Sequence, residues 1–318
     1  MMTDGPDAFS AALRAVSFAL LLNAAGIPFF IAAFGHLVPN SLSDVRKLGS
    51  RLAIAALVFV AAHQALEAAR MAGEMSGITD PAMQKMALLS PAGATFAARI
   101  LGLILVAAGL RPTRSPAGAN AAAGANAAVA RAETSRGIGM QPPVPTAANA
   151  IALVGALMII TSFTMMGHTT TSTQRAAAAA LVTLHLLVVA FWLGALWPLY
   201  LAAKKEQPAS AGHLIERFSV TATWAVPLIL LAGIGLSALL LPGLAVFRQP
   251  YGQLLLAKLA GFAVLMAMAS LNKWQFGPAC AAGNTAAFER TVVIEYALLC
   301  AVLTATAVMT TFFSPESA

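Results

Sequence analysis

Charged residues and cysteines are scarce in this chain. Of its 318 residues, 10% are Asp, Glu, Lys or Arg and 59% are hydrophobic, and the mean hydropathy is +0.80. A water-soluble domain does not have enough interior to hide so much apolar surface. The composition therefore predicts an integral membrane protein embedded in a lipid bilayer. The two cysteines, Cys280 and Cys300, are too few for a disulfide framework and do not indicate a redox compartment.

Motifs of common soluble enzymes are missing as well. We find no glycine-rich phosphate loop, no nucleophile elbow and no paired carboxylates, which argues against an ATP-driven pump and leaves open whether the protein is an enzyme. The formal net charge is +7, but the basic residues fall between apolar stretches, where they act as topology signals. We therefore expect no nucleic-acid partner. No basic region precedes the first apolar stretch, so we expect that stretch to be retained as a helix rather than cleaved as a signal peptide.

Long apolar stretches dominate what is present. A helix needs about 20 apolar residues to cross the hydrocarbon core of a bilayer, and eight stretches satisfy this length. They cover roughly residues 9–35, 51–69, 91–110, 147–167, 176–203, 218–241, 252–274 and 288–313. The predicted fold is an all-α polytopic membrane protein, a bundle of about eight transmembrane helices.

The apolar stretches fall into two groups. Residues 111–146 are rich in Ala, Gly and Pro and lack large apolar anchors, which predicts a flexible cytoplasmic linker. This linker separates an N-terminal three-helix part, residues 1–110, from a five-helix part, residues 147–318. The first part contains a predicted outer loop with four methionines, Met71, Met75, Met83 and Met86. Their spacings of four and three predict that each pair shares one face of a short interfacial helix, where packing is the simplest role.

Basic residues are concentrated in every second predicted loop. By the positive-inside rule these loops lie in the cytoplasm, so both termini lie on the periplasmic or extracellular side. The loops assigned to the cytoplasm contain Arg46, Lys47 and Arg51, then Arg111, Arg114, Arg131 and Arg136, then Lys204, Lys205 and Arg217, and finally Lys273 and Arg290. The opposite loops contain only Arg70, Lys85, Arg175 and Arg248.

Histidine and methionine side chains lie within or beside the apolar stretches on the predicted outer side. Met165, Met166 and His168 close the fourth stretch, and His63 and His185 lie at similar depths in the second and fifth. Imidazole and thioether groups are good copper ligands, whereas a hard ion would require carboxylates. We therefore predict a copper site in the outer half of the bundle. Hydrogen bonds between helices are the alternative use of such histidines.

A haem site is a second interpretation of two of these residues. His63 and His185 are on different helices at similar depth, and such a pair can supply both axial ligands of a haem b within a helix bundle. The protein would then be an electron-transfer protein or a cupric reductase.

Four charged residues lie within or near the apolar stretches, namely Arg14, Arg99, Lys258 and Glu295. An unpaired charge in hydrocarbon is costly, so each should have a partner or reach water. We expect Arg99 to pair with Glu67, and we expect Lys258 and Glu295 to be too far apart in depth to pair. Such charges either hold helices together or form part of a proton pathway.

Several motifs follow one another in residues 147–318. They are Gly167-His168, His185-Leu186-Leu187, the run Phe191-Trp192-Leu193-Gly194-Ala195-Leu196-Trp197-Pro198-Leu199, Arg217-Phe218-Ser219, Tyr251-Gly252, Leu254-Leu255, Lys258, Asn272 and Glu295. In this order they resemble the CopD family of bacterial copper-resistance membrane proteins. The first three helices resemble the N-terminal portion of longer family members through Met71-Ala72-Gly73, Asp80-Pro81 and the stretch around Arg99. The resemblance implies copper handling and copper resistance at the bacterial inner membrane, often with a periplasmic copper-binding protein as partner, and we expect transport of the ion through the His and Met site. It does not distinguish transport from reduction or sensing.

Overall fold

The structure is a computed structural model that describes residues 5–111, 146–166, 174–241 and 243–313. Within these residues it contains helices and no strands, and eight helices are long and apolar enough to cross a membrane. The prediction of an all-α polytopic membrane protein is therefore confirmed. The long helices are α1 (Gly5–Phe34), α2 (Leu42–Ala72), α4 (Pro91–Gly109), α6 (Ala147–Ser162), α7 (Arg175–Lys205), α8 (Pro208–Leu240), α9 (Pro250–Leu271) and α11 (Ala286–Phe312). The predicted linker lies almost entirely outside the described residues.

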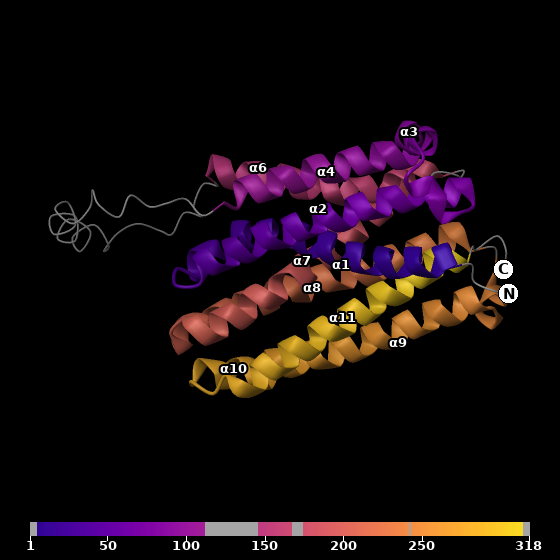
Figure 1. The fold of residues 1–318 in the computed structure, drawn as a ribbon. Coiled ribbons are helices and arrows are strands. Elements are labelled where there is room, and N and C mark those ends of the chain that lie inside the picture. Colours follow the sequence, from indigo (N-terminus) through magenta and orange to yellow (C-terminus); the bar gives the residue numbers. More distant parts are fainter. Residues whose placement is uncertain (1–4, 112–145, 167–173, 242, 314–318) are drawn as a thin grey trace, which may run out of the picture.

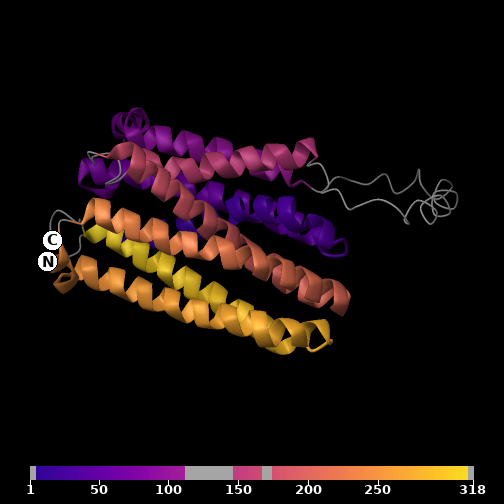
Figure 2. The same ribbon diagram turned by 180° about the vertical axis from the view of Figure 1, so that it is seen from behind.

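Short helical elements connect the long helices. They are the helices α3 (Pro81–Leu89) and α10 (Gly277–Ala281), the 3-10 turns η1 (Gly35–Leu37), η2 (Met75–Ile78), η3 (Phe163–Met165) and η4 (Leu244–Arg248), and the π-helical turn η5 (Asn272–Phe276). The long helices run side by side (Figures 1 and 2). The start of α1 and the end of α11 lie at the same end of the bundle as α3, which we call the α3 end. The α1–α2 and α7–α8 connections lie at the opposite end, which we call the α10 end.

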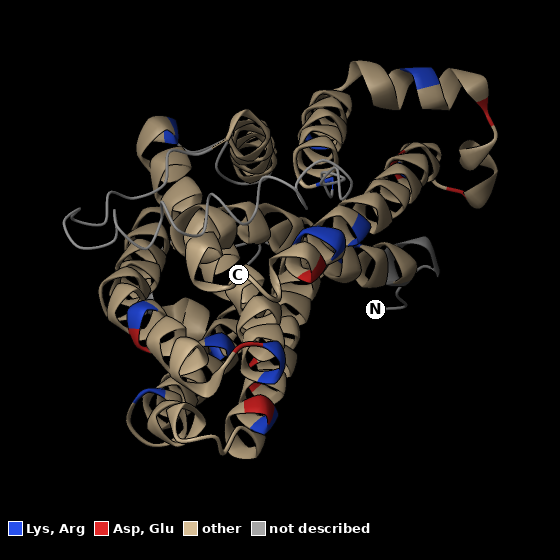
Figure 3. Ribbon diagram, turned by 90° about the vertical axis from the view of Figure 1, so that its left-hand side faces the viewer, with Lys and Arg blue, Asp and Glu red and all other residues tan. Residues whose placement is uncertain are grey.

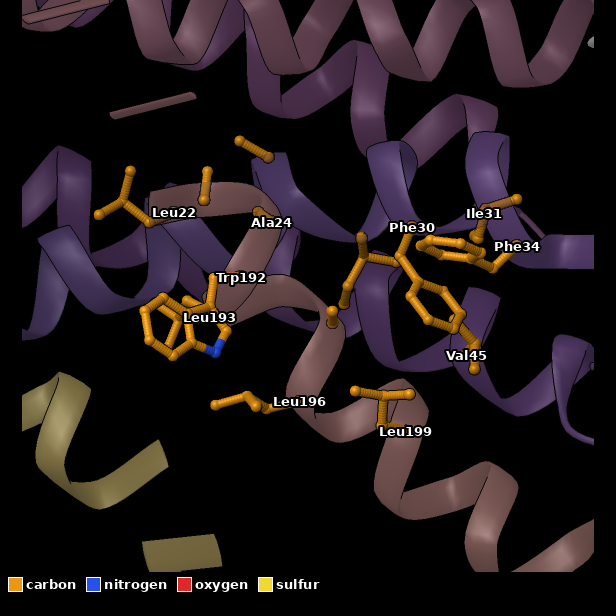
Figure 4. Packing of buried hydrophobic residues seen from close by; sticks show 14 of the residues in the cluster. Leu22, Ala24, Phe30, Ile31, Phe34, Val45, Trp192, Leu193, Leu196 and Leu199 are labelled. Atoms are coloured by element: carbon orange, nitrogen blue, oxygen red, sulfur yellow. The ribbon is translucent and has the colours of Figure 1, made fainter. Parts of the chain in front are cut away.

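Helix α1 joins the two predicted parts into one bundle. It packs against α2 and also against α6, α7 and α11, and the buried core contains side chains from both parts. Its crossing with α7 is very close: a Cβ atom on Gly26 would lie 1.9 Å from the Ala190 carbonyl oxygen, and one on Gly194 would lie 2.5 Å from the backbone of Gly26. Small residues at a crossing allow this approach of two membrane helices. Figure 4 shows buried residues of α1 and α7 beside the crossing, including Leu22, Phe30 and Trp192.

The helices extend further at the α10 end than the apolar stretches predicted. Helix α2 begins at Leu42, so Arg46 is a helical residue rather than a loop residue. Its guanidinium donates to the Asn149 side chain on α6 at 2.6 Å and to the Gly109 carbonyl on α4 at 3.3 Å. Lys204 and Lys205 likewise belong to the last turn of α7. The prediction of loops at these positions was wrong, because the length of an apolar stretch reports the hydrocarbon thickness and not the part of a helix that continues into water.

The methionine-rich segment is only partly as predicted. Met83 and Met86 do share a short helix, α3, which lies across the bundle direction at the α3 end (Figure 3). Met71 and Met75, however, belong to different elements, because α2 ends at Gly73 in the left-handed conformation with φ +77° and Met75 begins η2. The predicted pairing of these two residues on one helix was therefore wrong.

Candidate functional site

Two of the three predicted outer ligands can be located. Helix α6 ends in η3, and the side chains of Met165 and Met166 are 40% and 38% exposed at the α3 end of the bundle. His168 lies outside the described residues. Two thioethers are thus partly exposed at the α3 end of the bundle.

His185 lies ten residues after Arg175, the first residue of α7. A contact with α8 fixes the orientation of the His185 ring. Its Nδ1 atom is 3.0 Å from the main-chain carbonyl oxygen of Ile229. A carbonyl oxygen only accepts hydrogen bonds, so this contact requires the proton on Nδ1 and leaves a lone pair on Nε2. A histidine that donates one ring N–H to a carbonyl and keeps the other nitrogen free has the arrangement typical of metal-ligating histidines. The positive charge of Lys258 on α9 acts on the same ring.

His63 has very different surroundings. Its Nδ1 atom is buried and has no hydrogen-bond partner among the described residues, and the charges of Arg14, Arg70 and Arg99 act on the ring. Three positively charged guanidinium groups make this neighbourhood unfavourable for a metal ion, because like charges repel. His63 therefore has an available nitrogen but a less suitable electrostatic environment than His185.

The expected pairing of Arg99 with Glu67 was wrong. Glu67 instead pairs with Arg70, one helical turn away, at 3.1 Å. Arg99 donates from Nε to the Ser162 hydroxyl at 3.2 Å, and its guanidinium lies 4.6 Å from the centroid of the Phe163 ring. Ser162 and Phe163 come within reach because α4 and α6 cross closely: a Cβ atom on Gly155 would lie 2.5 Å from the carbonyl oxygen of Gly102.

The two intramembrane histidines have different neighbours. The groups that act on His63 belong to α1, α2 and α4, whereas those that act on His185 belong to α8 and α9. In the part of the chain that the structure describes, no group of three or more His, Cys, Asp or Glu side chains comes together in a way that could hold a metal ion. The geometry consequently offers no specific support for the haem pair.

A cavity of about 430 Å³ lies among α7, α8, α9 and α11, towards the α10 end. Its wall is largely apolar, but Glu295 and Asn272 contribute polar groups and are 3% and 8% exposed. The Asn272 amide donates to Glu295 Oε1 at 2.6 Å, and the Thr291 hydroxyl donates to Asn272 Oδ1 at 2.5 Å. Asn272 begins the π-helical turn η5, a type of irregularity that often marks functional positions.

Sequence analysis singled out Glu295 and Asn272 separately but missed their contact and the cavity. As expected, Lys258 and Glu295 do not pair: the hydrogen bond to Glu295 comes from Asn272. Thr291 lies one turn before Glu295 on α11, so the two residues share a polar face of that helix. This polar face is the feature of the sequence that could have indicated the site. The side chain that meets this face comes from η5, and no sequence pattern specified that contact.

Comparisons with known proteins identify the family. The family model "Copper resistance protein D" matches residues 212–309, and "Copper resistance protein D-like, N-terminal domain" matches residues 2–137. The intervening segment, which contains α6 and α7 with Met165, Met166 and His185, lies outside both matches. No curated protein and no solved structure matched the chain. The two matches together cover most of the sequence, in the order N-terminal domain and then D domain, and the chain belongs to the copper resistance protein D family.

Proposed function

We propose that this protein carries copper across a bacterial inner membrane, with the α3 end facing the periplasm. The family supports copper handling, and the eight long apolar helices support a multi-pass membrane location. The orientation rests on charge: the α10 end has the larger share of Lys and Arg, which the positive-inside rule assigns to the cytoplasm. Both termini are then periplasmic.

The observation that carries the proposal is the hydrogen bond from His185 to the Ile229 carbonyl. This bond leaves the Nε2 lone pair of a partly buried imidazole available to a metal ion, and it fixes the direction of that lone pair. Copper in either common oxidation state accepts imidazole nitrogen. His185 is therefore the central ligand of the proposed site.

The entry to this site is formed by Met165, Met166 and His168. The exposed thioethers can accept copper from solution or from a periplasmic copper-binding protein, which is the proposed partner. His185 lies about 15 Å deeper along α7, given a helical rise of about 1.5 Å per residue. His63 completes the predicted set as a second partly buried imidazole, although the neighbouring arginine charges make it the weaker ligand.

Copper accumulation in cells tests this function. Cells that produce the protein should accumulate a different amount of copper from cells that lack it, and His185→Ala should remove most of that difference. The matched control is His213→Ala, because His213 is a solvent-exposed histidine of α8 that interacts with Glu216 at 3.9 Å. Equal copper content in cells with and without the wild-type protein would rule out transport.

A further inference from the structure

Glu295 is a buried carboxyl group, and among the residues that the structure describes no opposite charge pairs with it. Its hydrogen-bond donor is the neutral amide of Asn272, and the indole of Trp192 also approaches it. Lys273 is the other charged residue of the cavity wall, but its ammonium group donates to the Thr223 hydroxyl at 2.9 Å. A carboxylate that is buried without a cation has a high free energy. Binding a proton removes the charge and lowers this free energy.

Two histidines lie on the helices around Glu295, His185 on α7 and His213 on α8, but neither is among the described residues that line the cavity. The cavity wall formed by the described residues of α7, α8 and α9 contains no second carboxyl group, histidine, cysteine or tyrosine. Helix α1, the remaining neighbour of α11, directs Asn23 toward the Tyr296 hydroxyl, and its Arg14 donates to the Thr310 carbonyl far along the helix. On α11 itself, Glu289 lies nearer the α10 end, where it accepts from Thr285 and pairs with Lys204 at 3.6 Å.

The cavity extends from this carboxyl along residues that lie towards the α10 end of the bundle. Its volume of about 430 Å³ is many times the space one water molecule occupies, about 30 Å³. Polar side chains continue along its wall from Glu295 and Asn272 to Ser270, Thr223 and Lys273. Lys273 lies in η5, close to the α10 end, and is only partly buried.

We propose that Glu295 is a proton-binding site that exchanges its proton with the solution at the α10 end through this cavity. Asn272, held by Thr291, donates to Oε1 and holds the carboxyl group in place while it gains or loses the proton. The exchange is a protonation of the carboxylate to the neutral acid and its reversal, with water at the α10 end as donor and acceptor. The site gives the bundle an exchangeable charge that is independent of the proposed copper ligands.

Labelling with dicyclohexylcarbodiimide tests the proton site. This apolar reagent adds to protonated carboxylic acids in membranes, and peptide mass spectrometry locates the adduct. The full-length protein in sealed liposomes should be labelled at Glu295 at neutral pH, and Glu295→Gln should lose this adduct. Glu289→Gln is the matched control on the same helix and should keep the adduct at Glu295.

Setting the pH separately on the two sides of oriented liposomes tests the direction of access. Labelling of Glu295 should fall when the pH at the α10 end is raised and should not respond to the pH at the α3 end. The absence of an adduct at Glu295 in the wild-type protein would overturn the proposal. Labelling that follows the pH at the α3 end, or neither pH, would overturn it as well. None of these outcomes depends on copper movement.

Discussion

At the scale of single residues, the backbone decides which atom of His185 is available for chemistry. The carbonyl of Ile229 accepts from Nδ1, so the free lone pair belongs to Nε2. Lys258 adds a positive charge near this ring and has no hydrogen bond or ion pair with any residue that the structure describes. A neighbouring cation opposes the binding of a metal ion because the two charges repel in a low-dielectric interior.

Removing that charge should strengthen copper binding. We expect Lys258→Met to lower the dissociation constant of Cu(I) at His185 severalfold, because methionine keeps an extended apolar side chain without the ammonium group. Lys258→Arg keeps the charge and should bind as the wild type does. Competition with a colorimetric Cu(I) chelator in detergent measures both affinities, and weaker binding by Lys258→Met would mean that the lysine supports the site instead of opposing it.

At the scale of helices, close crossings determine which side chains can meet. The contact of α1 with α7 depends on Gly26 and Gly194, and the contact of α4 with α6 depends on Gly102 and Gly155. The second crossing brings Ser162 to Arg99, which gives this partly buried arginine a hydrogen-bond partner. We predicted Glu67 as the partner of Arg99 from the depths of the two residues. This prediction was wrong because depth does not specify how each helix is rotated about its axis.

The α1–α7 crossing should not tolerate a single added methyl group. A Cβ atom on Gly26 would lie 1.9 Å from the Ala190 carbonyl oxygen, so Gly26→Ala must separate the helices. We expect a loss of about 1–3 kcal/mol in the free energy of unfolding, or more, as for other overpacked interiors. Denaturant titration in detergent measures this loss.

Gly233→Ala is the control for this experiment. Its Cβ atom would approach the His185 ring only to 3.9 Å, an ordinary van der Waals contact, so its effect on stability should be small. Equal stabilities for Gly26→Ala and the wild-type protein would contradict the close crossing of α1 with α7.

At the scale of the whole molecule, the parts of the chain before residue 111 and after residue 146 form one bundle. Helix α1 from the N-terminal part packs against α7 and α11 as well as α2, and the core is continuous across them. Polar contacts at the α10 end add to this connection: the backbone N–H and hydroxyl of Ser41 donate to the buried Glu206 carboxylate at 2.8 and 2.7 Å. The chain between residues 111 and 146 is therefore not needed to hold the parts together.

Cutting that connection should leave the assembly intact. A protease site inserted near residue 125 should allow complete cleavage in detergent, after which an affinity tag on the C-terminal fragment should retain the N-terminal fragment in equal amount. The uncut protein, taken through the same purification, is the control. Separation of the fragments under mild detergent conditions would show that the two segments are independent domains.

The sequence predicts the number of membrane helices but only part of the site. Eight spans are predictable because the hydrocarbon thickness imposes a minimum apolar length on each one. The start of α2 and the separation of Met71 from Met75 are not predictable in this way. Where a helix ends outside the hydrocarbon layer depends on local signals such as Gly73. The Asn272–Glu295 contact and its cavity depend on the π-helical turn and on the packing of four helices, which no short motif specifies.

Uptake of Cu(I) by liposomes containing the purified protein tests the central claim most directly. A chelating dye trapped inside reports the ion that has crossed, and protein-free liposomes give the background. The account predicts uptake above background for the wild type and His213→Ala, and uptake at or near background for His185→Ala. Uptake by His185→Ala at the wild-type rate would contradict the account, because copper would then cross the bundle without the imidazole that the Ile229 carbonyl orients.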